Sequence, residues 1–187
     1  MNALTFLHQE HQNVDALFKR FEDAGPKATK TKSEIVQKVI EHLSVHAAIE
    51  EQVFYPAVEQ AVPSAKGMVL EALEEHHGAK MFLMELEKLP PTFERYDAKV
   101  TVLIEQVRHH VEEEENELFP QVREAMTVQE LEELGERLQE ARKAAPTRPH
   151  PFQPDRPPLN LVLGAPVAVW DRAVNTGKEL VGRLLNR

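Results

Sequence analysis

The chain has 187 residues, a formal net charge of −9 and no cysteine. Its length suits one well-buried domain with an appendage and is too short for two ordinary domains. Without cysteine there are no disulfides, no thiolate metal sites and no thiol nucleophile, so any metal must be held by histidine and carboxylate groups. The negative charge argues against nucleic acid as the main partner, because phosphate binding needs a clustered positive surface.

The composition and the N-terminus indicate a helical protein of the cytoplasm. Glycine is scarce and alternating β-branched residues are hard to find, which favours an all-α fold. The first residues have neither a basic region nor a long apolar core, and no stretch of the chain has the character of a membrane-spanning helix. We therefore expect a cytoplasmic location.

Apolar residues recur at helical spacing in five successive segments. We expect helices from Asn2 to Asp23, from Ser33 toward Pro56, from Pro63 to Pro90, from Thr92 through Leu118, and, as a short fifth helix, from Thr127 through Leu138. Ser33 is the expected N-cap of the second helix, and Pro56 should kink it near its end. Thr127 and Glu130 form a capping-box pattern at the start of the fifth.

The C-terminal part has a different composition. Six prolines fall within 146–158, which predicts an extended, poorly packed linker. The last residues predict an amphipathic helix that includes Trp170, with an apolar edge that should dock on its own bundle or on a second subunit as a homodimer. Membrane-surface attachment is a less favoured alternative. The predicted divisions are a bundle at 1–145, a linker at 146–160 and a helix at 161–187.

Two stretches of the chain are near copies of each other. Residues 42–56 and 106–120 each contain His-x-x-x-Glu and end in an aromatic residue followed by proline. The matching pairs are His46 with Glu50 and His110 with Glu114. Residues four apart lie side by side on a helix, so an imidazole and a carboxylate at this spacing can reach one metal ion. Burying an ionised glutamate here also requires a compensating partner.

A second pair of matching stretches completes the repeat. Residues 75–83 resemble residues 10–18, so that His76 corresponds to His11 at nearly the same offset that separates His46 from His110. The chain is therefore predicted to be a tandem repeat of a helical hairpin.

Two stacked hairpins would bring six inward-facing polar residues to one level of a four-helix core. They are His11, His46, Glu50, His76, His110 and Glu114. Carboxylates can span two cations about 3.5 to 4 Å apart while histidines terminate each side, so this inventory suits a dinuclear centre. The alternative is six unrelated polar residues satisfied by hydrogen bonds, which we disfavour because the repeat places all six inward. The neighbouring acidic residues, Glu112, Glu113, Glu115 and Glu117, should mostly face water.

At these residues, over roughly 3–143, the sequence resembles the hemerythrin-like, or HHE cation-binding, family. The resemblance implies an up-down-up-down four-helix bundle with a non-haem di-iron site, in which Glu50 and Glu114 bridge the irons and the four histidines cap them. Family members bind, store, sense or detoxify dioxygen and related species such as nitric oxide or peroxide, and some handle iron itself. Zinc or manganese stays open as the metal, because these ligands discriminate poorly.

The third helix departs from the family pattern. The oxygen carriers of the family have a fifth histidine one turn from another on that helix, whereas this chain has Lys80 one turn after His76 and Ala72 one turn before it. Either a substitute ligand fills the gap, or an iron keeps an extra exchangeable position.

Three side chains are candidate substitutes for the missing ligand. His42, one turn before His46, is favoured over His77 and over Asp15. The remaining histidines, His109 and His150, are expected to face solvent.

The leading functional prediction is a di-iron protein that binds dioxygen or a related small ligand and is not principally an enzyme. One alternative is a di-iron enzyme that consumes peroxide or nitric oxide, and another is a regulatory module whose metal site controls docking of the Trp170 helix on a partner. A single vacant position in a dry apolar pocket would favour reversible binding, and two exchangeable positions would favour turnover. The sequence leaves this choice open.

Overall fold

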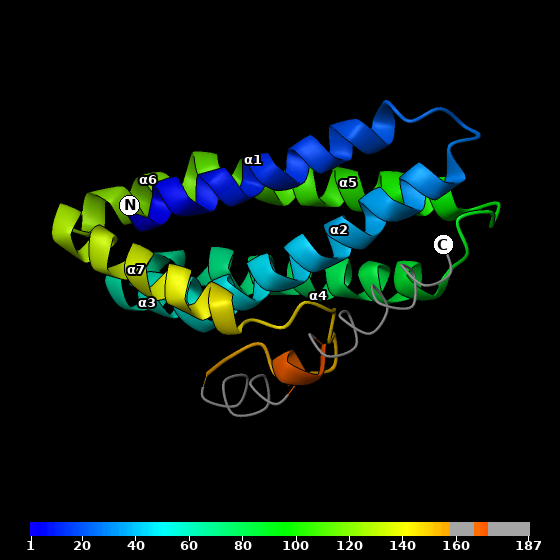
Figure 1. Cartoon of the computed structure of the whole chain (residues 1–187). Helices are drawn as coiled ribbons and strands as arrows, with labels where there is room; N and C mark the ends of the chain where they lie inside the picture. The colour runs from blue at the N-terminus through cyan, green and yellow to red at the C-terminus, as the bar shows by residue number, and fades with distance from the viewer. Residues whose placement is uncertain (158–166, 172–187) are drawn as a thin grey trace.

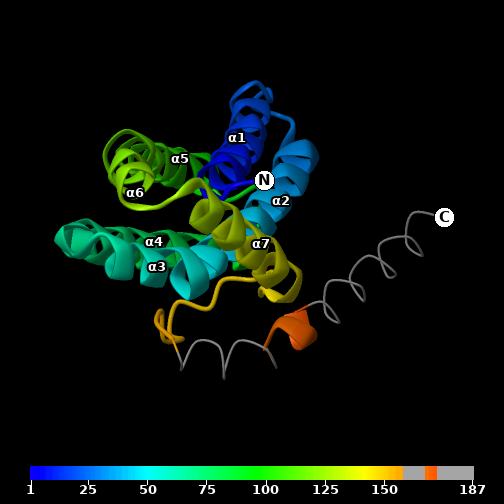
Figure 2. The ribbon, with the colours of Figure 1, turned by 90° about the vertical axis from the view of Figure 1, so that its left-hand side faces the viewer.

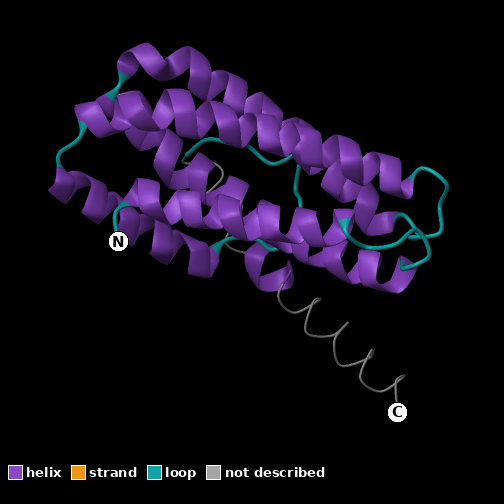
Figure 3. Cartoon of the chain, turned by 90° about the horizontal axis from the view of Figure 1, so that it is seen from above, coloured by secondary structure: helices purple, strands orange, loops and turns teal. Residues whose placement is uncertain are grey.

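The computed structural model describes residues 1–157 and 167–171, and all regular secondary structure in these ranges is helical (Figures 1 and 3). The helices are α1 (Ala3–Glu22), α2 (Thr29–Ile49), α3 (Tyr55–Ala61), α4 (Lys66–Lys88), α5 (Tyr96–Glu113), α6 (Phe119–Ala125) and α7 (Val128–Ala144), with a short 3-10 turn at Pro63–Ala65. Within the described ranges no helix has the length and hydrophobicity needed to cross a membrane.

Four long helices form the bundle. α1 packs on α2 and α4 packs on α5, each pair running antiparallel, and the two hairpins face each other (Figures 1 and 2). The predicted all-α, four-helix architecture is therefore confirmed. Because sequence neighbours are antiparallel, residues at matching heights of the four helices meet in the interior.

Each of the two long helices that carries a His-x-x-x-Glu motif contains a widened turn. The π turns lie at Glu50–Phe54 and Glu114–Leu118, where the amides of Tyr55 and Phe119 donate to the carbonyls of Glu50 and Glu114. The next residue is proline in both cases, which has no amide hydrogen and crowds the carbonyl four residues back. The extra residue relieves that conflict, so the expected kink becomes a bulge and the helix continues as α3 or α6.

The second helix begins earlier than predicted. It starts at Thr29 rather than Ser33, and its N-cap, Ala28, makes no side-chain cap. Lys32 in this first turn is buried, forms an ion pair with Asp97 and lies 5.0 Å from the ring centroid of Phe21. Tertiary contacts of Lys32, which no local cap pattern reveals, thus hold the start of the helix.

Helix α7 closes one end of the bundle, where it packs on α1 and on the first π turn (Figure 2). Its capping box at Thr127 and Glu130 is confirmed, and at 17 residues it is longer than the short helix predicted. Gly135 makes the closest approach, since a Cβ atom there would lie 2.2 Å from the carbonyl oxygen of Met1. Only glycine therefore allows this contact between α7 and the N-terminus.

The proline-rich segment is fastened to the bundle, so the prediction of a poorly packed linker is wrong for its described part. Pro146, Pro149 and Pro151 are buried. Arg148 is paired with Glu87, and its amide donates to Asp171 in the helical turn at 167–171.

His150 also corrects a prediction, because it pairs with the buried Asp171 at 3.0 Å instead of only facing solvent. Trp170 is 69% exposed, so this turn faces the protein through Ala168 and Asp171 rather than through its tryptophan. Most of the predicted C-terminal helix lies outside the described residues, and a homodimer through it stays a prediction.

Substitution of Gly135 tests the docking of α7. We expect Gly135→Ala to lower the free energy of unfolding by about 1–3 kcal/mol, because the methyl group meets backbone atoms that cannot give way. The matched control is Gly78→Ala, in the interior of α4 with open space around it, which should raise stability by about 1 kcal/mol through helix propensity. Urea unfolding followed by circular dichroism measures both, and equal effects would contradict the assigned contact.

Candidate metal centre

The six residues singled out from the sequence meet in the middle of the bundle. His11 comes from α1, His46 from α2, His76 from α4 and His110 from α5, while Glu50 and Glu114 are the first residues of the two π turns. None is more than 6% exposed.

These six lie between two separate apolar clusters. One cluster occupies the α7 end of the bundle and includes Leu7, Ile49, Leu73 and Leu118; the other occupies the far end and includes Val14, Leu43, Leu83 and Val107. In each long helix the polar positions fall between residues of the two clusters. The centre is thus a polar layer enclosed by hydrocarbon on both sides.

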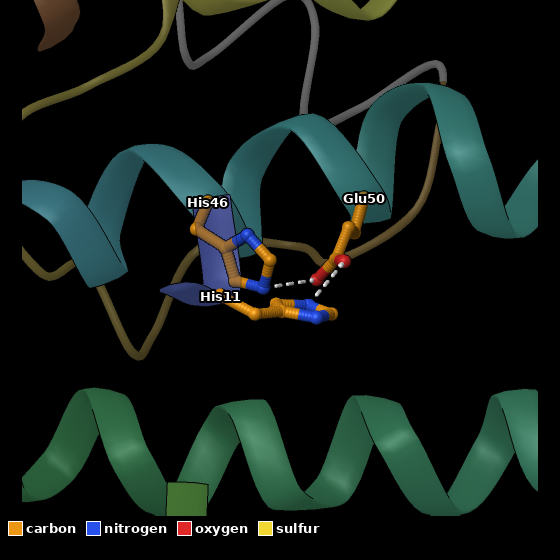
Figure 4. Close-up of side chains that lie close together, drawn as sticks. All are labelled: His11, His46 and Glu50. Atoms are coloured by element: carbon orange, nitrogen blue, oxygen red, sulfur yellow. Dashed lines mark ion pairs between the residues drawn. The ribbon is translucent and has the colours of Figure 1, made fainter. Parts of the chain in front are cut away.

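The first group of facing ligand atoms comes from α1 and α2 (Figure 4). His46 Nε2 lies 3.1 Å from a Glu50 oxygen, one helical turn along the same chain segment. His11 Nε2 approaches the other Glu50 oxygen at 3.9 Å from the neighbouring helix. An imidazole pair and a carboxylate therefore converge on one point.

The second group comes from the other hairpin and shares Glu50 with the first. His76 Nε2 lies 3.3 Å from Glu50 and 3.2 Å from His110 Nε2. Glu114 links the two groups from its own side, at 3.4 Å from His11 Nε2 and 4.0 Å from His110 Nε2. Both carboxylates thus contact histidines of both groups, the arrangement that bridging ligands require.

The polar atoms of this layer lack the partners that buried groups normally have. Within the described chain, His11 Nε2, His46 Nε2 and both oxygens of Glu50 and of Glu114 are buried without a hydrogen-bond partner. Buried carboxylates without compensation are costly. Hydrogen bonding therefore does not satisfy the layer, whereas cations would, and the residues present fit a metal-binding site.

Three outer carboxylates hold the ligand histidines, and sequence reasoning missed all three. Glu115 accepts from His11 Nδ1 at 2.7 Å, Glu51 from His76 Nδ1 at 3.1 Å and Glu75 from His110 Nδ1 at 2.7 Å. Such bonds fix the ring and leave Nε2 free to point at a metal. Glu115 was expected to face water, and this expectation is wrong.

A signal for two of these carboxylates was present in the repeat. Glu51 and Glu115 follow Glu50 and Glu114 at corresponding positions, and each reaches across to a histidine of the opposite hairpin. Lys80, in place of a fifth histidine, donates to Glu51 at 2.7 Å. Lys80, the residue of α4 that departs from the family pattern, thus holds an outer carboxylate.

Tyr55 is a further polar group at the centre that the sequence did not reveal. Its buried hydroxyl lies 3.4 Å from His76 Nε2. At regular helical spacing Tyr55 would be rotated by about 140° from Glu50, but the extra residue of the π turn reduces this to about 40°. The corresponding residue of the second half is Phe119, whose ring stacks on His11 at 6.0 Å.

Protons occupy this layer in the metal-free chain. Burial lowers the pKa of His11 and of His76, but the glutamates paired with them outweigh it, so that the pKa of His11 lies well above its usual value and that of His76 rises to about 9. Burial lowers the pKa of His46 to about 3. Although burial opposes it, these histidines hold the pKa of Glu50 well below its usual value.

The substitute ligands proposed from the sequence do not reach the centre. His42 is half-buried and belongs to neither group of ligand atoms, and His77 is exposed. Asp15 is paired with Lys19 and Arg108 instead.

A small apolar cavity adjoins the centre between α2, α4 and α5. Its volume is about 30 Å³, and the polar residues among those that line it are His46, Glu75, His76, Lys80, Gln106 and His110. Leu43, Leu83 and Val107 supply much of the remaining lining. This is room for one or two molecules the size of water.

An all-helical bundle with buried groups of histidine and glutamate defines a metal-binding protein of the hemerythrin type. Residues 2–122, more than half of the chain, match the family described as Hemerythrin HHE cation binding domain. The chain therefore belongs to this family, as its resemblance predicted.

Individual relatives support the assignment. The chain is 23% identical over 167 residues to an uncharacterized hemerythrin-like protein of Schizosaccharomyces pombe, covering 89% of this chain and 81% of the relative. It is 24% identical over 142 residues to a DNA nickase of Nostoc sp., covering 76% of this chain but 39% of the nickase. A crystal structure of a hemerythrin HHE cation binding domain-containing protein from Mycobacterium kansasii aligns with a TM-score of 0.65 and 25% identity, covering 76% of this chain and 88% of that one.

The stability of the metal-free protein should peak near pH 6.5. The pKa of His76 is raised to about 9, so the protonated His76 stabilises the folded protein. This contribution to the free energy of unfolding is complete below about pH 6.5 and is lost as the pH rises toward 9. The pKa of His46 is lowered to about 3 in the folded protein, so between about pH 6.5 and 3 His46 takes up a proton only in the unfolded chain. The free energy of unfolding therefore falls by up to about 1.4 kcal/mol for each pH unit below 6.5.

Urea unfolding of chelator-treated protein at about pH 9, 6.5 and 5 measures this dependence. His46→Leu is the control, because it removes the group that titrates only in the unfolded chain. The free energy of unfolding of this variant should change less between pH 6.5 and 5, with its change between pH 6.5 and 9 unaltered. A stability that is constant between pH 5 and 9 would contradict the assignment.

Proposed function

We propose that this protein is a non-haem di-iron hemerythrin-like protein that binds dioxygen or a related small ligand. The observation that carries the proposal is the sharing of Glu50 by two groups of buried ligand atoms, each with two histidines. One carboxylate with two such groups matches the inventory of a dinuclear centre better than that of a single ion. Iron is favoured over zinc and manganese by the family resemblance, since the ligand types alone do not discriminate.

In this proposal His11 and His46 would hold one ion, His76 and His110 would hold the other, and Glu50 and Glu114 would offer carboxylate oxygens to both. When bound, two iron ions would supply the electrons needed to bind or reduce such a ligand. The protein's own contribution is to exclude water with the two apolar clusters and to fix the imidazoles through Glu51, Glu75 and Glu115.

The cavity beside the centre supports a small neutral ligand. Its volume of about 30 Å³ excludes larger substrates, and its lining is mainly apolar. Dioxygen, nitric oxide and peroxide are all within this size. A mainly apolar surface also limits the water around a ligand held there, which favours binding over turnover.

A second candidate function is turnover of peroxide or nitric oxide. The observation that favours it is Tyr55, whose buried hydroxyl lies 3.4 Å from His76 Nε2 and could deliver a proton to a reacting ligand. Burial, together with Glu114 and Glu50, holds the pKa of Tyr55 well above its usual value, so the hydroxyl keeps its proton at neutral pH and is a weak acid. The third alternative, a regulatory module, depends on the predicted C-terminal helix, most of which lies outside the described residues.

Removal of either bridging carboxylate tests the centre. We expect Glu50→Ala and Glu114→Ala each to lose bound metal, because both carboxylates are proposed to contact both ions. Metal analysis of the purified proteins measures this, with exposed Glu112→Ala as a control that should keep about two ions per chain. A content near two in either bridging variant would refute its role.

Absorption spectra under air and argon distinguish the two functions. Reversible binding predicts a visible spectrum of the iron-loaded protein that changes in air and returns under argon. Tyr55→Phe places at this position the residue type that the second half has at Phe119. This variant should keep the reversible spectral change. Turnover would instead be favoured if the wild type consumes peroxide rapidly and Tyr55→Phe consumes it at least about tenfold more slowly. A well-placed general acid typically contributes about a hundredfold or more to the rate.

A further inference from the structure

A second opening approaches the centre between α4 and α5. It is a cleft of about 60 Å³ lined by Glu71, Glu75, Glu113, Glu114 and Glu117, with His110, Ala72, Met68 and Leu118. We call these five glutamates and their surroundings the acidic cleft. The described residues that line it include no lysine or arginine.

Exposure falls steadily along the cleft. Glu71 and Glu117 are exposed, Glu75 and Glu113 are half-buried, and Glu114 at the inner end is only 3% exposed. Glu114 is one of the two proposed bridging ligands, and neither of its oxygens has a hydrogen-bond partner in the described chain. The most buried carboxylate that lines the cleft is thus a proposed metal ligand without a hydrogen-bond partner in the described chain.

A second group of potential ligands stands near the outer end. One atom from each of Glu75, His109 and Glu113 lies within 4.8 Å of the others. His109 is 64% exposed and lies 3.3 Å from Glu113. Glu75 also holds His110 at 2.7 Å, so the same carboxylate touches the outer group and a ligand of the centre.

The acidic cleft suits a cation, and the apolar cavity does not. Converging carboxylates with low-dielectric walls raise the local concentration of cations. The cleft has room for only a few waters, so an arriving ion must lose part of its hydration shell, and the glutamates can replace those oxygens. The surface of the apolar cavity, by contrast, is mainly hydrocarbon, and Glu75 is the one carboxylate residue among those that line it.

We propose that divalent metal ions reach the centre through the acidic cleft, pausing at Glu75, His109 and Glu113 before transfer to Glu114 and His110. Small neutral ligands use the apolar cavity, so metal loading and ligand binding occur from different openings. This inference rests on the proposed metal centre. The bridging and capping residues determine how much metal is bound, and the cleft determines how fast it arrives.

Two triple variants separate the cleft from general charge effects. The cleft variant is Glu71→Gln/Glu113→Gln/Glu117→Gln, and the control is Glu74→Gln/Glu105→Gln/Glu112→Gln. The control removes the same charge from exposed positions on α4 and α5 that do not line the cleft. Circular dichroism checks that both variants keep their helix content.

The measurement is the uptake of Co²⁺ by the chelator-treated full chain, followed by stopped-flow absorbance at low salt. We expect the cleft variant to load at least about tenfold more slowly than the wild type and the control, with the same final metal content. Added salt should narrow the difference, because screening weakens the attraction.

Release of Co²⁺ from the loaded proteins to excess chelator provides the second measurement. If affinity is unchanged, slower uptake requires equally slower release, so the cleft variant should also release its metal more slowly. Uptake and release at the rates of the control, with normal metal content, would overturn the cleft while leaving the metal centre standing. A wild type that takes up no metal would overturn both proposals.

Discussion

The structure depends on keeping two carboxylates charged inside a hydrocarbon core. Glu50 and Glu114 are almost fully buried, lie between two apolar clusters and have no hydrogen-bond partner in the described chain. Such groups need positive charge nearby. In the metal-free protein, protons on His11 and His76 supply part of it, as their raised pKa values indicate. Metal ions would displace these protons, so metal binding and proton release are linked.

In the tandem hairpin, outer carboxylates of each half hold histidines of the other half close to these buried charges. Glu51 of the first hairpin holds His76 of the second, and Glu115 of the second holds His11 of the first. Neither hairpin can therefore orient its own histidines completely. The polar layer cross-links the bundle at its middle, and the apolar clusters on both sides exclude the water that would weaken these bonds.

The two halves differ in residues close to the centre. Tyr55 and Phe119 occupy corresponding positions, yet only Tyr55 brings a hydroxyl to the centre. Glu10 and Glu75 also correspond, but Glu10 turns to Arg142 of α7, whereas Glu75 holds His110 and lines the acidic cleft. Helix α7 thus covers the first half, and the second half keeps the opening through which we propose that metal arrives.

The sequence by itself determined the helical class, the tandem repeat and the six inward-facing residues around His46 and Glu50, because helical spacing alone decides which side chains share a face. The family resemblance added the di-iron interpretation. Only the tertiary structure decided that Glu51 reaches the opposite hairpin, that Lys80 serves Glu51, and that the segment after Ala145 is fastened to the bundle. Contacts between distant segments depend on how helices are rotated when they pack. One extra residue in a π turn changes that rotation by about 100°, which is why Tyr55 faces the centre.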